Sequence, residues 1–154
     1  MAMELYVLSD SRPVSFDAWQ EAIYANGFPL RLSAERPFGK LGGVLPGLLS
    51  GRTTAFECDH WNMADLIADF PELHVGHCWT HALAFRWGRN VYDGIGAYMA
   101  AGAYAALTGG VVFDCVEGKI ISPERAGEIA MEIERQIPLV EEAMQRMRGK
   151  FSRV

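Results

Sequence analysis

The sequence predicts an α+β fold in which a single mixed or mainly antiparallel sheet packs against about four helices. Segments that alternate apolar and polar residues interleave with segments whose apolar residues recur at helical spacing. Several of the strand-like segments are joined by short turns, which favours antiparallel neighbours. Half of the 154 residues are hydrophobic, which is enough for one core. No repeat or linker divides the chain, so we expect one domain over residues 1–154.

The first half of the chain predicts three strands and one helix. Residues 4–9 (ELYVLS) form the first strand. A helix follows from Ser15, a good N-cap, with Asp17 in its first turn, and Gly27 ends it. Residues 28–33 (FPLRLS) form the second strand. Residues 36–52 are rich in Gly and Pro and predict an irregular segment before the strand at residues 53–61.

The second half predicts one strand and a hairpin among three helices. Asn62 or Asp59 caps a short helix over residues 62–73, and a strand follows at residues 77–87. Asp93 caps the next helix, which is apolar on most of its surface and should be enclosed. Residues 111–121 form a hairpin, and Ser122 and Pro123 begin the last helix.

The last helix has one apolar stripe and an internal proline. Pro138 predicts a kink or a division of the helix. The stripe consists of Ala126, Ile129, Ile133, Ile137, Val140, Met144 and Met147. A stripe of this length exceeds what a small sheet can cover, so its end predicts a partner contact or a homodimer.

Charge and composition restrict the classes of function. The net charge of −5 gives no electrostatic reason to bind nucleic acid or an anionic membrane. No apolar run approaches the roughly 20 residues needed to span a bilayer, and the start (MAMELYVLSDSR) is not typical of a signal peptide. The odd number of cysteines (Cys58, Cys78, Cys115), without a CxxC motif, is typical of a reducing compartment. We therefore expect a cytoplasmic protein.

Histidines and a cysteine suggest a zinc site as one alternative. The candidate ligands are Cys58, His60, His77 and His81. On a strand, however, His77 and His81 would lie about 13 Å apart, too far for one ion. We therefore favour histidines that bond to the backbone or to nearby carboxylates, without a cofactor. A small zinc-binding protein, or an enzyme using this Cys/His cluster, remains an alternative.

Acidic residues predict a surface for a protein partner. Glu57 and Asp59 lie two apart on a predicted strand and therefore on one face. With Trp61, Asp65 and Asp69 they predict an acidic contact with an aromatic anchor. Two carboxylates at this spacing also suit general acid–base chemistry, which is the enzymatic alternative.

The end of the chain resembles a known class of proteins. An Ala-rich helix runs into TGGVVFD, followed by EGKIIS and the capped helix PERAGEIAMEIE. This order is similar to the endings of small bacterial α+β proteins, among them immunity proteins, which bind and block a toxin. The resemblance covers about the last third of the chain and carries over no binding residue.

The resemblance implies a bacterial, non-enzymatic protein-binding module whose partner is a protein such as a toxin. A third alternative is a small-ligand-binding domain with its pocket under residues 36–52, because a loop of that length is often functional.

Overall fold

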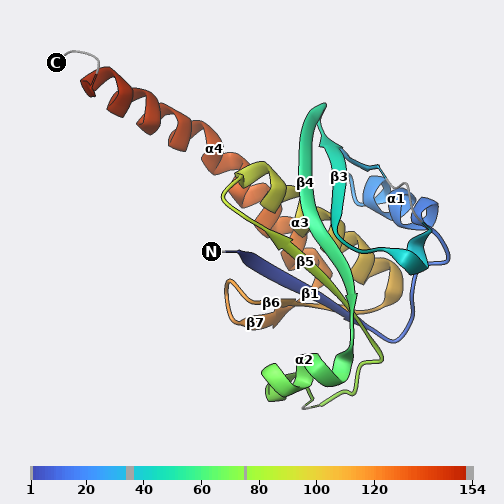
Figure 1. Cartoon of the computed structure of the whole chain (residues 1–154). Coiled ribbons are helices and arrows are strands. Elements are labelled where there is room, and N and C mark those ends of the chain that lie inside the picture. Colours follow the sequence, from blue (N-terminus) through green and yellow to red (C-terminus); the bar gives the residue numbers. More distant parts are fainter. Residues whose placement is uncertain (1, 34–36, 75, 152–154) are drawn as a thin grey trace.

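A computed structural model describes residues 2–33, 37–74 and 76–151 (Figure 1). Its strands form one seven-stranded sheet in the order β2-β3-β4-β5-β1-β6-β7. Every neighbouring pair is antiparallel. Four α-helices accompany the sheet, so the predicted α+β fold class is confirmed.

The elements have the following bounds. The strands are β1 (Met3–Ser9), β2 (Leu30–Leu32), β3 (Val44–Leu49), β4 (Arg52–Trp61), β5 (His81–Trp87), β6 (Val111–Asp114) and β7 (Lys119–Ile121). The helices are α1 (Phe16–Ala25), α2 (Met63–Asp69), α3 (Val91–Thr108) and α4 (Pro123–Phe151), with short 3₁₀ turns η1 (Phe38–Lys40) and η2 (Pro71–His74).

One face of the sheet lies under α1, α3 and α4, and we call it the covered face. Trp19 of α1 is fully buried there, and its indole Nε1 donates to the Ala100 carbonyl oxygen at 3.0 Å. Residues 94–105 of α3 are all buried, which confirms the prediction of an enclosed helix. The small residues let α3 and α4 pack closely: a Cβ added to Gly102 would lie 3.1 Å from the Pro123 carbonyl oxygen.

The opposite face is covered only in part. Leu66 of α2 and Leu73 of η2 pack on Tyr6, Leu8 and Phe113. Figure 1 shows α2 beside the end of β4 that lies away from the β3–β4 turn. The part of this face that β3 and β4 make is called the open sheet face. Its side chains are Val44, Pro46, Leu48, Thr53, Ala55 and Glu57.

Several predicted caps are confirmed, and one is wrong. The Ser15, Asn62 and Ser122 side chains accept hydrogen bonds from the first turns of α1, α2 and α4. Asp93, however, does not cap α3. That position belongs to Asn90, whose side chain accepts from the Tyr92 N–H at 2.9 Å. Asp93 instead accepts from the Ala55 N–H at 2.9 Å and ties α3 to β4.

The predicted strand over residues 77–87 is too long, because β5 begins at His81. Asp10, just after β1, accepts from the Thr80 N–H and hydroxyl, both at 3.1 Å, and bonds to His77. These bonds hold residues 77–80 outside the strand. His77 and His81 therefore do not share a strand face, contrary to the prediction.

The prediction of an irregular segment over residues 36–52 is wrong in part, because β3 (Val44–Leu49) lies within it. Arg36 lies outside the described residues. Ser50 and Gly51, both with positive φ, form a two-residue turn between β3 and β4. Pro46 and Gly47 obscured the alternation of β3 in the sequence. At Gly47 of β3 a Cβ would lie 2.9 Å from the Arg31 carbonyl oxygen of β2. The close approach of β2 therefore requires glycine at position 47.

The last helix passes through Pro138 and runs unbroken from Pro123 to Phe151. Of the two predicted outcomes at Pro138, a kink or a division, the division does not occur. Figure 1 shows the end of α4 extending away from the sheet and the other helices.

Candidate functional site

A row of charged side chains crosses the sheet beside the open sheet face. Glu57 of β4, Arg86 of β5 and Glu4 of β1 are direct cross-strand neighbours. Arg86 Nε lies 3.0 Å from Glu4 Oε1. The Arg86 guanidinium also lies 5.1 Å from the Trp61 ring centroid. Glu4 and Arg86 were missed by sequence reasoning, because only the strand order places β5 next to β4 and β1 next to β5.

Asp59 and Trp61 lie on the same side of β4 as Glu57. Asp59 Oδ1 accepts from the Gly43 N–H at 2.7 Å, which fixes the start of β3. Trp61 is half-buried, and its ring meets the Tyr6 ring edge-on with centroids 5.6 Å apart. Burial raises the pKa of Tyr6 to about 12, so its hydroxyl stays protonated and donates to Glu4. Trp61 is therefore packed in part and accessible in part.

The remaining two predicted contact residues lie on α2, which follows β4 directly. Leu66 is fully buried and holds α2 against this side of the sheet, while Asp65 and Asp69 are exposed. The structure thus places all five predicted residues on one side of the sheet. We call this set the acidic patch: Glu57, Asp59, Trp61, Asp65 and Asp69.

A hollow of about 270 Å³ lies where the open sheet face meets the charged row. Val44 and Glu57 of the open sheet face and Arg86 of β5 are among the residues that line it. The surface near the acidic patch is therefore concave, with an apolar side chain and two charged side chains at its rim.

The predicted zinc ligands are distributed differently from what that alternative requires. Cys58 lies on the covered face and is fully buried. Burial raises the pKa of its thiol, and the charge of Asp59 adds to this, so the thiolate that zinc needs is disfavoured. His60 points to the same face, where its Nε2 lies 3.1 Å from the Phe38 carbonyl oxygen.

The other two histidines, His77 and His81, differ from each other in their contacts. His77 Nε2 bonds to Asp10 Oδ2 at 2.7 Å in the loop before β5. Burial, followed by the nearby Arg12 and His60, lowers the pKa of His81. Arg12 lies near both His60 and His81, and its positive charge opposes a cation bound there. Across residues 2–33, 37–74 and 76–151, no three His, Cys, Asp or Glu side chains gather as a metal site.

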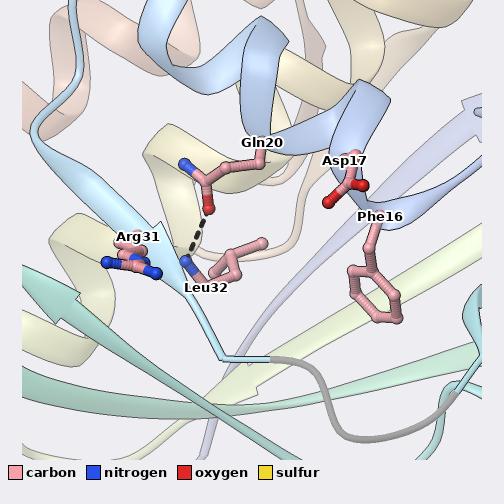
Figure 2. Close-up of a pocket in the computed structure, with 5 residues that line it drawn as sticks. All are labelled: Phe16, Asp17, Gln20, Arg31 and Leu32. Carbon is pink, nitrogen blue, oxygen red and sulfur yellow. Dashed lines mark hydrogen bonds between the residues drawn. The ribbon is translucent and has the colours of Figure 1, made fainter.

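A second hollow, of about 260 Å³, lies between α1 and β2 (Figure 2). Phe16, Asp17, Gln20, Arg31 and Leu32 line it. Gln20 bridges the two elements, because its side chain donates to the Leu30 carbonyl oxygen and accepts from the Leu32 N–H, both at 2.7 Å. The amide is therefore used to hold β2. The lining of this hollow comes from α1 and β2, and not from the described part of residues 36–52, where a ligand pocket was predicted.

Comparison of the chain with protein-family models, with curated proteins and with solved structures found no match. Within the described ranges, every helix is too short or too polar to cross a membrane.

Proposed function

We propose that this chain is a non-enzymatic protein-binding module of the bacterial immunity type, which neutralises a partner such as a toxin. Its contact surface is the acidic patch together with the adjoining open sheet face. The observation that carries the proposal is the position of four carboxylates and the half-buried Trp61 beside a strand surface with exposed apolar side chains.

The open sheet face supplies the apolar part of this contact. Val44 is 65% exposed and Leu48 is 39% exposed, and Pro46 between them is exposed as well. These three side chains follow one another along the same side of β3. Apolar side chains beside a polar rim are typical of protein interfaces. A flat partner surface or a partner helix would bury them.

The acidic patch supplies the charge. Its carboxylates come from Glu57, Asp59, Asp65 and Asp69, while the neighbouring Arg86 is already paired with Glu4. A surface of one sign attracts a basic partner and raises the rate of association. Trp61 at its centre has the character of a binding hot spot.

We place this activity in the bacterial cytoplasm and assign it no cofactor. All three cysteines lie in the described part of the chain and none forms a disulfide, which is compatible with a reducing compartment.

The test is co-expression with the product of the adjacent gene, followed by measurement of a stoichiometric complex. Val44→Glu should weaken the complex at least 10-fold. The control is Ile120→Glu, which changes another exposed apolar residue on the same side of the sheet but at its opposite edge, and which should leave affinity unchanged. Lack of a complex, or equal affinity of both variants, would contradict the proposal.

A further inference from the structure

The end of α4 has an apolar stripe that continues past its packing surface. Ala126 and Ala130 are fully buried against the core, and Ile133 and Ile137 pack against it in part. From Ala126, the positions 130, 133, 137, 140, 144 and 147 follow in steps of four and three residues. This is the heptad pattern of a helix that packs along one seam.

The helix α3 does not extend far enough to cover the whole seam. Its first residue, Val91, lies beside Ile133 and Ile137 around a hollow of about 100 Å³. The Tyr92 hydroxyl reaches Glu141 Oε1 at 3.3 Å, which marks the far end of the contact between α3 and α4. Beyond this point Met144 is 52% exposed and Met147 is 60% exposed.

We propose that the seam at the end of α4 pairs with the same segment of a second copy of this chain, in antiparallel orientation. The charge order of the segment identifies the partner. Glu141 and Glu142 are followed only by basic charged residues, Arg146, Arg148 and Lys150, up to residue 151. Arg146 pairs with Glu142 within the helix at 2.6 Å. Antiparallel pairing sets Glu141 of one copy against the basic turns of the other, whereas parallel pairing sets like charges together.

The geometry of α4 agrees with this arrangement. Pro138 lies next to Ile137 but outside the seam, so its ring does not interrupt the paired surface. Antiparallel pairing also keeps the two folded bodies at opposite ends of the contact. A projecting helical segment of this length has only marginal stability from propensity alone, and burial of Met144 and Met147 would stabilise it.

The test is the molar mass of the full chain by sedimentation across a micromolar concentration series. The wild type should dimerise, and Met144→Glu with Met147→Glu should be monomeric. The matched control is Leu139→Glu: Leu139 is 68% exposed on the same part of α4 but lies off the seam, so this variant should remain a dimer. None of these side chains belongs to the core, so each variant should fold. Circular dichroism checks that it does.

Three results would overturn the inference. The first is a wild-type chain that stays monomeric throughout the series. The second is a dimer that survives Met144→Glu with Met147→Glu, and the third is a monomer that binds vesicles containing anionic lipid through α4. The test uses no partner protein, so its result is independent of the function proposed above.

Discussion

The two faces of the sheet are built from the same strands but have different surroundings. On β3, Leu45 and Leu49 point to the covered face and are buried, while Val44 and Leu48 point to the open sheet face. The covered face meets three helices, whereas within the described residues the other face meets α2 and η2 alone. An antiparallel sheet needs one packed face for stability and can offer the other to solvent or to a partner.

The difference also concerns polar groups. On the covered side, Asp114 is fully buried, and its carboxylate accepts from the Tyr98 hydroxyl at 2.8 Å and from the Val116 and Glu117 N–H groups. On the other side, Glu57 is exposed to solvent at the rim of the hollow. Buried carboxylates here stabilise the fold, and exposed ones remain available for a partner.

The largest effect should come from two substitutions on the same strand. Leu45→Ala removes a side chain that is 3% exposed, and it should lower the free energy of unfolding by about 2–5 kcal/mol. Leu48→Ala, at 39% exposure, should lower it by less than about 1 kcal/mol. Urea unfolding of both variants makes the comparison. Equal losses would show that the open sheet face is packed like the covered one.

Removal of one buried hydroxyl should have an intermediate effect. Tyr98→Phe deletes the hydrogen bond to the Asp114 carboxylate, so it should lower the free energy of unfolding by about 1.5–3 kcal/mol. Tyr24→Phe on the exposed side of α1 serves as the control and should change nothing measurable. A loss no larger than that of the control would mean that the Tyr98 hydroxyl does not stabilise Asp114.

The ion pair beside the open sheet face should contribute less. Arg86→Ala removes the contact with Glu4 and the Trp61 ring, and unfolding in urea should show a loss below about 1 kcal/mol. Both partners are partly exposed, so water replaces much of the interaction. A loss comparable to that of Leu45→Ala would show that this ion pair stabilises the fold as strongly as a buried core side chain.

The smallest expected effect is a pH dependence from the covered side. Burial is the main cause that lowers the pKa of His60 and of His81 in the fold. As the pH falls, these two histidines therefore take up protons in the unfolded chain before they do so in the folded one. Stability should be full above about pH 6.5 and should fall as the pH drops through the lower pKa values of the folded state.

The measurement for this prediction is the urea midpoint of the wild type and of His60→Gln with His81→Gln, from about pH 7.5 to about pH 5. The double variant should show a flatter profile in this range. Asp10, whose pKa is lowered mainly by its bond to His77, contributes only at more acidic pH. Identical slopes for the two proteins would exclude the histidines as the source.

The sequence predicted those features that depend on neighbouring residues. Ser15, Asn62 and Ser122 were found as caps because an N-cap acts within a few residues. The enclosed helix α3 followed from its composition. The fold class was confirmed, but the strand order was not predictable, because cross-strand pairing depends on contacts distant in the sequence.

The errors have the same physical origin. Residues 77–80 have strand-like composition, but Asp10, nearly 70 positions earlier, holds them in a loop. In β3, Gly47 is required by the approach of the Arg31 carbonyl oxygen, which the sequence does not show. The five residues of the acidic patch could be proposed from alternation and helix position, whereas Glu4 and Arg86 required the sheet register.

The association rate with the captured partner tests the central claim most directly. Glu57→Lys with Asp65→Lys reverses the charge of the acidic patch. The control, Glu21→Lys with Glu134→Lys, makes the same change in net charge at exposed positions of α1 and α4. At low salt the first variant should associate about 10-fold more slowly than the control. Equal association rates for the two variants would contradict a partner contact at the acidic patch.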